Sequence, residues 1–307
     1  MHAFIATPLL DALIDLAFAE DLGTGDVTSA ATIPADASAT FELRAREPLV
    51  VCGAPVVDRL LWRFGPQAPS VAWHLAEGTL AQPGEVIGVL SGTLRTLLAV
   101  ERPTLNFMQR MAGVATLTRR YVQAIEGTRA RIVDTRKTLP GWRLLDKYAV
   151  RVGGGTNHRA ALDGGILIKD NHLQGAGGIA EAVRAARAYA PHSLRVEVEV
   201  EDLPGLLTAL DAGADIVMLD NFSPRQVEAA VKLAQGRALL EASGGVNLDT
   251  VRAFAEAGVD LISVGALTHS ARAVDIGADV TTTLHGARGD DTRSEPQTLP
   301  ALDAPEQ

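Results

Sequence analysis

The chain has 307 residues, of which 47% are hydrophobic and 21% are charged, and its formal net charge at pH 7 is -9. This composition excludes a disordered chain and provides enough apolar residues for two domains. The negative charge argues against general binding of nucleic acid. A single cysteine, Cys52, excludes an internal disulfide and a cysteine-based zinc site, and it favours a reducing, cytoplasmic location.

The first hundred residues combine helical and β-like patterns. Apolar residues between 9 and 18 are interrupted by Asp11 and Asp15, which is typical of an amphipathic helix and not of a signal peptide. No apolar run is long enough to span a membrane, so no membrane partner is expected. Helical patterns also cover 56–64 and 94–125, and the second connects two domains. Short β-like runs predict an antiparallel sheet at 41–44, 71–75 and 86–90.

From about residue 130, strand, loop and helix patterns alternate. Helix-start signals such as Asp202 before Pro204 fill the intervals between apolar runs. This alternation predicts parallel β/α units. The runs predicted as strands are 131–133, 165–168, 194–198, 215–219, 238–240 and 260–264. We expect an N-terminal domain at 1–107, a catalytic α/β domain at 108–287 and, from its polar composition, a disordered tail at 288–307.

The segment 134–172 carries most of the residues suited to binding anions. The chain has 24 arginines but only four lysines, and three of these, Lys137, Lys147 and Lys169, lie in this segment. A compact ammonium is therefore favoured at these positions. Together with its arginines and two histidines, the segment can donate to carboxylates or phosphates. A solvated basic face is the alternative interpretation, and His172 could either brace its loop or contact a substrate.

Polar and small residues follow each predicted strand, where β/α barrels build their active sites. The glycine turns at 243–245 and 264–266 allow backbone amides to approach an anion and predict a phosphate site. Glu199 and Asp220 suit either Mg²⁺ shared with phosphate oxygens or the hydroxyls of a ribose, and the residue types do not separate these uses. Ordinary loop polarity is the other explanation of this pattern.

Several of these motifs resemble the quinolinate phosphoribosyltransferase family, also called carboxylating nicotinate-nucleotide pyrophosphorylase. They are Asp-Thr-Arg-Lys-Thr at 134–138, Gly-Gly-Gly-Thr-Asn-His-Arg at 153–159, Ile-Lys-Asp-Asn-His at 168–172 and Leu-Thr-His-Ser at 267–270. The resemblance implies an α/β fold, in which an open, TIM-like α/β barrel follows an N-terminal α+β open sandwich. It also implies Mg²⁺ but no organic cofactor, and a homodimer whose subunits complete each other's sites.

The implied reaction transfers phosphoribose from phosphoribosyl pyrophosphate to quinolinate, with loss of carbon dioxide, and gives nicotinate mononucleotide and pyrophosphate for NAD biosynthesis. The residues implied to bind quinolinate are Arg102, reaching from the partner subunit, Arg136, His158, Arg159 and Lys169. Those implied to bind phosphoribosyl pyrophosphate are Lys137, Glu199, Asp220, Ser243, Gly244, Gly245, Gly265 and His269. The implied catalytic residues are Lys137, Lys169, Glu199 and Asp220, and the possible metal ligands are Glu199 and Asp220.

The residue types suit each step of this reaction. Glu199 or Asp220 could stabilise positive charge on the ribose, while Mg²⁺ and Lys137 neutralise the leaving pyrophosphate. After ribosylation, the cationic ring nitrogen accepts the electron pair left by carbon dioxide, and Lys169 or a water molecule would supply the proton. Two other functions remain open at this point. One is that of the related protein encoded with molybdate transporters, and the other is non-catalytic binding of phosphoribosyl pyrophosphate.

Overall fold

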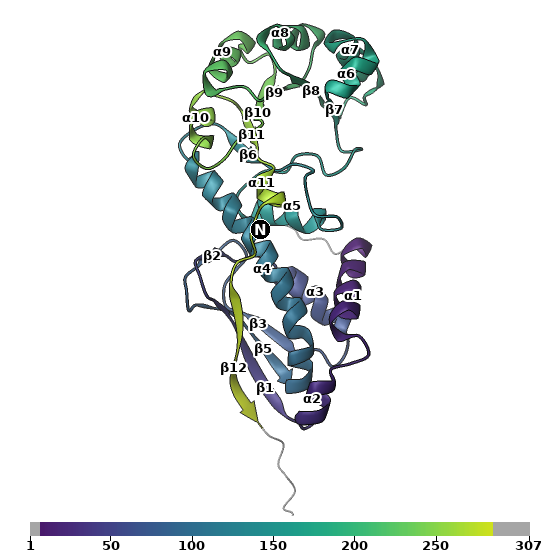
Figure 1. Cartoon of the computed structure of the whole chain (residues 1–307), viewed down its shortest axis with the longest axis vertical. Coiled ribbons are helices and arrows are strands. Elements are labelled where there is room, and N and C mark those ends of the chain that lie inside the picture. Colours follow the sequence, from purple (N-terminus) through teal and green to yellow (C-terminus); the bar gives the residue numbers. More distant parts are fainter. Residues whose placement is uncertain (1–6, 285–307) are drawn as a thin grey trace, which may run out of the picture.

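The computed structural model describes residues 7–284 and divides into two parts joined by the long helix α4, Leu94–Ala124 (Figure 1). In this described range, one part is built on a four-stranded antiparallel sheet of order β12-β1-β5-β3. The other is built on a six-stranded parallel sheet of order β6-β11-β10-β9-β8-β7. Within residues 7–284, no helix has the length and apolar character that a membrane crossing requires.

The antiparallel sheet forms because its strands alternate between buried and more exposed side chains. In β1, Phe41 and Leu43 are both 2% exposed, whereas Glu42 between them is half-buried. Helix α1 begins after Thr7, whose hydroxyl accepts from the amide of Leu10. The elements of this part are α1 (Pro8–Leu22), α2 (Val27–Thr32), β1 (Ser38–Ala45), β2 (Leu49–Val50), α3 (Ala54–Phe64), β3 (Ser70–Trp73), β4 (Leu80–Ala81), β5 (Val86–Thr93) and β12 (Ile276–Leu284).

Strand β12 belongs to this first sheet, although it comes last in the chain. It pairs with β1 in antiparallel register, with Leu43 opposite Ala278. The range 108–287, which the sequence pattern assigned to the barrel, therefore includes a strand of the N-terminal sheet. Local patterning does not reveal a partner that lies more than two hundred residues away. The predicted tail at 288–307 lies outside the described residues.

Close packing fixes the path by which the chain returns to this sheet. A Cβ on Gly113 of α4 would lie 2.0 Å from the carbonyl oxygen of Arg272, so only glycine fits where the two segments cross.

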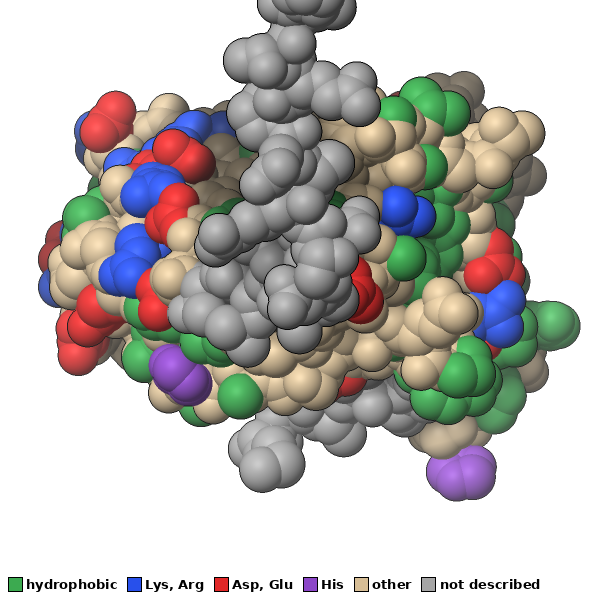
Figure 2. Space-filling view, turned by 90° about the horizontal axis from the view of Figure 1, so that it is seen from below, with side chains coloured by type: hydrophobic (Ala, Val, Ile, Leu, Met, Phe, Trp, Pro, Cys, Tyr) green, Lys and Arg blue, Asp and Glu red, His purple; other side chains and the backbone are tan. Residues whose placement is uncertain are grey.

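The end of the molecule that this sheet forms is seen in Figure 2, where acidic and basic side chains lie next to each other along one side. In the same sheet region, Arg46 and Asp279 form an ion pair.

The parallel sheet confirms the predicted alternation of strands and helices. In the described chain, β6 and β7 are the two edge strands of this sheet and do not pair with each other. The barrel is therefore open (Figure 1). The strands are β6 (Arg131–Val133), β7 (Ile166–Ile168), β8 (Val196–Val200), β9 (Ile216–Asp220), β10 (Leu239–Ser243) and β11 (Leu261–Ser263). The helices are α5 (Arg143–Val152), α6 (Asp170–Ala176), α7 (Ile179–Tyr189), α8 (Leu203–Ala212), α9 (Pro224–Ala234), α10 (Val251–Glu256) and α11 (Ala266–His269).

Candidate active site

A cavity of about 180 Å³ lies in the parallel sheet, towards the carboxyl ends of its strands. Several of the residues predicted to bind anions line it. Its lining consists of Thr135, Arg136, Lys137, His158, Arg159, Leu167, Lys169, Met218, Glu241, Ser243 and Ser263. Parallel strands bring these side chains together because their carboxyl ends meet at one edge of the sheet.

The acidic side of the site lies on neighbouring strands. Glu199 is on β8 and contacts the ammonium group of Lys169, which follows β7. Asp220 ends β9 and accepts a hydrogen bond of 2.7 Å from the side chain of Asn221. Burial raises the pKa of Asp220, and the charge of Glu199 raises it further. The two carboxylates are thus close enough to repel each other, as groups that share a cation do.

The glycine turn after β10 has a backbone conformation that favours glycine. Gly244 has a φ of 95° and Gly245 a φ of 63°, which is the left-handed region that favours glycine. A Cβ on Gly244 would also lie 2.2 Å from Oδ1 of Asn221. Position 244 therefore requires glycine for two reasons: its φ is positive, and Asn221 at the end of β9 approaches it closely.

The turn after β11 lies next to the predicted phosphate residues. A Cβ on Gly265 would lie 3.0 Å from Nε2 of His269 and 3.2 Å from Cδ of Lys137. The hydroxyl of Thr268 donates a hydrogen bond of 2.7 Å to the backbone carbonyl of Lys137. The structure therefore brings Gly265, His269 and Lys137 together, although their places in the sequence are far apart.

Lys147 does not join the anion-binding groups that the sequence placed near it. It is 6% exposed, and its ammonium lies 2.5 Å from Oδ1 of the fully buried Asp134. The same carboxylate accepts from the side chain of Asn157 at 2.6 Å and from the backbone amide of His158 at 2.8 Å. Lys147 and Asp134 therefore hold the loop that carries His158 and Arg159.

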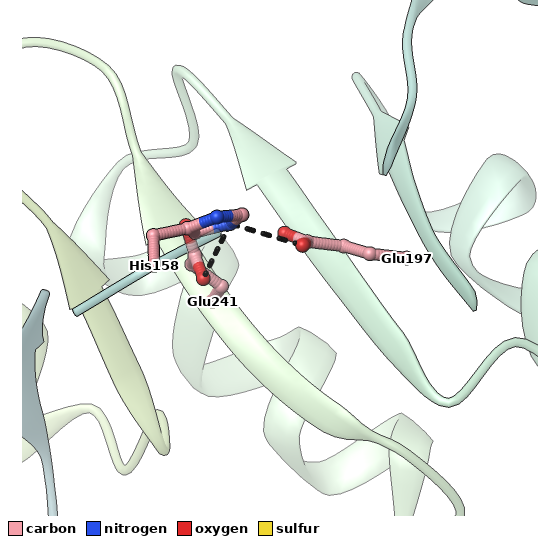
Figure 3. Close-up of side chains that lie close together, drawn as sticks. All are labelled: His158, Glu197 and Glu241. Atoms are coloured by element: carbon pink, nitrogen blue, oxygen red, sulfur yellow. Dashed lines mark ion pairs between the residues drawn. The ribbon is translucent and has the colours of Figure 1, made fainter. Parts of the chain in front are cut away.

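The middle of the barrel contains a polar layer formed by His158, Glu197 and Glu241, which we call the central layer (Figure 3). Nε2 of His158 lies 3.0 Å from Glu197 and 3.9 Å from Glu241. Nδ1 accepts the backbone N–H of Arg159 at 2.7 Å, and a nitrogen that accepts carries no proton. The hydrogen bond to Glu197 raises the pKa of His158, but the contact at Nδ1 opposes a second proton on the ring.

This arrangement has two consequences for the chemistry of the central layer. The three side chains are close enough to suggest a metal site. However, a metal on Nε2 would require Nδ1 to carry the proton, and Nδ1 already accepts a hydrogen bond. His158 is therefore held as the tautomer that donates from Nε2 to Glu197.

Glu241 was not among the predicted site residues, although an acid inside the apolar run 239–242 was a signal that could have identified it.

The remaining predicted residues fall in different places. Arg159 donates to the carbonyl of Gly165 at 2.9 Å, and Arg136 is exposed at the cavity. Nδ1 of His172 accepts from the amide of Lys169, so this ring braces its loop. Arg102 is exposed on α4 and does not line this cavity of the described chain. The cavity of one chain thus lacks one of the residues implied to bind quinolinate.

An open β/α barrel with an anion-binding cavity at the carboxyl ends of its strands is the class that the fold and site define. The sequence matches two family models, quinolinate phosphoribosyl transferase N-terminal domain over residues 26–112 and C-terminal domain over residues 114–279. The chain belongs to the quinolinate phosphoribosyl transferase family.

Individual relatives cover most of the chain. It is 43% identical over 272 residues to a probable nicotinate-nucleotide pyrophosphorylase [carboxylating] of Bacillus subtilis (strain 168), covering 89% of this chain and 93% of that protein. It is 45% identical over 266 residues to the Mycobacterium leprae nicotinate-nucleotide pyrophosphorylase [carboxylating], covering 85% and 93%. The crystal structure of NadC from Streptococcus pyogenes is similar with a TM-score of 0.87 and 38% identity, covering 92% of this chain and all of that one.

Proposed function

We propose that this protein transfers phosphoribose from phosphoribosyl pyrophosphate to quinolinate and removes one carboxylate as carbon dioxide, giving nicotinate mononucleotide and pyrophosphate. The observation that carries this proposal is the cavity in which Arg136, Arg159 and Lys169 lie together at the carboxyl ends of the strands. Relatives at 43% and 45% identity are named for the same reaction. The comparisons lend no support to the transporter-linked or non-catalytic alternatives.

The cationic lining suits a small aromatic dianion. Quinolinate carries two adjacent carboxylates, and an arginine fork can bind a carboxylate through two parallel hydrogen bonds. Nε of Arg159 is buried and has no hydrogen-bond partner among the described residues, so the guanidinium retains a free donor. His158 has both ring nitrogens engaged, so its contribution is to shape the cavity floor unless substrate displaces one of these contacts.

The acidic side suits phosphoribosyl pyrophosphate with its cation. Glu199 and Asp220 offer carboxylate oxygens, which are the ligands that Mg²⁺ prefers, and their mutual repulsion fits a site that takes up positive charge. Mg²⁺ bound there would neutralise the charge of the leaving pyrophosphate. Glu199 and Asp220 could instead hold the ribose hydroxyls, while Lys137 reaches the pyrophosphate. The 5-phosphate would meet Ser243, Gly244, Gly245, Gly265 and His269.

The transfer step depends mainly on position and charge. The quinolinate nitrogen attacks the anomeric carbon as the bond to pyrophosphate breaks, and positive charge develops on the ribose. Glu199 and Asp220 stabilise that charge, and Lys137 stabilises the leaving group. Holding the two substrates in line supplies a large part of the rate.

The exposed position of Arg102 supports a homodimer with shared sites. In a single chain this arginine does not line the cavity, and no hydrogen bond joins its side chain to another described residue. We propose that it completes the quinolinate site of a partner subunit. A cytoplasmic location remains a proposal that rests on the single cysteine, Cys52, which is buried and unpaired.

To test this proposal, purified protein is incubated with Mg²⁺, phosphoribosyl pyrophosphate and either quinolinate or nicotinate, and the products are measured. We expect carbon dioxide, pyrophosphate and nicotinate mononucleotide from quinolinate, and no product from nicotinate. Product from nicotinate, or from neither acid, would overturn the proposed function. Mixing Arg102→Ala protein with Arg136→Ala protein tests the shared site, because mixed dimers would regain one complete cavity and with it part of the activity.

A further inference from the structure

Glu241 is the most unusual charged residue of the barrel. It lies on β10 among apolar neighbours, and its side chain is fully buried. Neither of its carboxyl oxygens has a hydrogen-bond partner of good geometry among the described residues, although the Ser263 hydroxyl is near enough to lower the pKa of this group. Burying an ionised carboxylate without partners costs several kcal/mol, so such a group takes up a proton more readily than an exposed one.

Its surroundings strengthen this preference for the protonated form. Burial raises the pKa of Glu241 to about 7, and the neighbouring Glu197 carboxylate adds to the rise. Three other groups face it and oppose this rise in pKa, namely His158 on its loop, Ser263 on β11 and Lys169 after β7. Glu241 is thus an acid that holds a proton near neutral pH and can also release it.

Two cavities of the described structure meet at this residue. The first is the substrate cavity at the carboxyl ends of the strands. The second, of about 350 Å³, opens at the other end of the barrel beside Arg131, Arg195 and Leu239. Glu241 lines both, as do His158 and Arg159. Both carboxyl oxygens are enclosed, so Glu241 lies between the two cavities, and a change of side-chain rotamer would expose its proton to either one.

We propose that Glu241 delivers the proton to the ring carbon that loses carbon dioxide. This inference rests on the proposed function and adds a catalytic residue to it. Sequence alone had suggested Lys169 or a water molecule for this step. The ammonium of Lys169, however, is in contact with Glu199, whereas the carboxyl group of Glu241 lies 3.9 Å from Nε2 of His158, beyond hydrogen-bonding distance.

The step balances without any further reactant. The bond between the ring carbon next to the nitrogen and its carboxylate breaks, carbon dioxide leaves, and the electron pair stays on the ring carbon beside the cationic nitrogen. The O–H bond of Glu241 then breaks, and the proton forms a C–H bond at that carbon. Glu241 remains as a carboxylate and regains a proton from water in the second cavity while product still occupies the first.

The test follows pyrophosphate, carbon dioxide and nicotinate mononucleotide in single turnovers of the wild-type protein, Glu241→Gln and Glu241→Asp. We expect Glu241→Gln to slow nicotinate mononucleotide formation about 100-fold more than pyrophosphate release, since positioned acids contribute 10²- to 10⁴-fold. Quinolinate mononucleotide should accumulate in this variant, and Glu241→Asp should recover part of the difference. Glu228→Gln, which makes the same change at an exposed glutamate of α9 that does not line the cavity, should leave the two rates matched.

Each outcome bears on one proposal. Equal slowing of pyrophosphate release and mononucleotide formation in Glu241→Gln, or slowing of neither, would overturn the role of Glu241. Absence of pyrophosphate from the wild-type protein would instead overturn the proposed function. If Glu241→Gln does not fold, the same two rates are measured in the wild-type protein as a function of pH. Mononucleotide formation must then fall relative to pyrophosphate release as pH rises through about 7. A constant ratio would contradict the proposal.

Discussion

Charged side chains lie in different surroundings in the two parts of the molecule. In the N-terminal part, ion pairs such as Arg63–Asp15 lie on the surface, with the two side chains 33% and 50% exposed. In the barrel, Lys147 and Asp134 form a pair whose side chains are 8% and 0% exposed, and the two glutamates of the central layer are similarly buried. The surface ion pairs contribute little to the free energy of unfolding. The buried charges, in contrast, determine which conformation the site loop adopts and where protons are held.

The largest expected effect comes from breaking the buried pair. Lys147→Met leaves the carboxylate of Asp134 without its cation, and removing one partner of a buried pair costs roughly 3–5 kcal/mol. The free energy of unfolding, measured with denaturant, should fall by this amount. Lys232→Met is the control, because Lys232 forms an exposed pair with Glu228, and it should leave stability almost unchanged. Similar values for the two variants would remove the distinction between the buried and exposed pairs.

The next effect concerns the pH dependence of stability. The pKa of Glu241 is raised to about 7 in the folded protein, so its contribution is fully present below about 4.5 and is lost as pH rises through about 7. Between pH 4.5 and 8 the wild-type protein should therefore lose roughly 3 kcal/mol of stability relative to Glu241→Gln, at 1.36 kcal/mol for each pH unit of the shift. Unfolding curves of both proteins across this range measure the difference. Parallel pH profiles would show that Glu241 is already ionised in the folded state at low pH.

A smaller effect is expected for Arg136→Ala at the cavity. Loss of a hydrogen bond to a charged group costs about 1.5–3 kcal/mol, which raises the KM for quinolinate roughly 10- to 100-fold. The KM for phosphoribosyl pyrophosphate should change much less, because other residues hold it. Arg131→Ala, at the opposite end of β6, is the matched control and should change neither constant appreciably. Equal effects on both substrates would contradict the assignment of Arg136 to quinolinate.

The smallest effect should come from the surface of the N-terminal part. Arg63→Gln removes the pair with Asp15, and exposed ion pairs contribute little to stability because water screens them. Thermal unfolding should therefore move by a few degrees at most, with activity unchanged. A loss as large as that of Lys147→Met would mean that the contact between α1 and α3 is not a simple surface pair.

Much of the barrel was predictable because its signals are local. The strand cores and the turns at Gly244 and Gly265 follow from apolar runs and small residues, and these predictions of element type are confirmed. The fold class is likewise confirmed. The roles of the predicted site residues stay predictions, since geometry brings them together without showing what they bind.

Other features depend on tertiary burial and were out of reach of local patterns. Lys147 appeared equivalent to Lys137 and Lys169 until Asp134 was found beside it in the interior. Glu241 gave one local signal, but its missing partners and its two cavities are properties of the folded barrel. The partner of β12 was hidden for the same reason, because strand pairing at long range leaves no mark in the neighbouring sequence.

The pairing of β12 with β1 has a consequence for how the protein is made. The chain emerges from the ribosome from its N-terminus, so the first three strands of the antiparallel sheet exist long before β12 has been synthesised. Until then β1 is an edge strand with unpaired backbone groups, which is a site where chains pair wrongly or aggregate. The first part of this protein to be synthesised is therefore among the last to be completed.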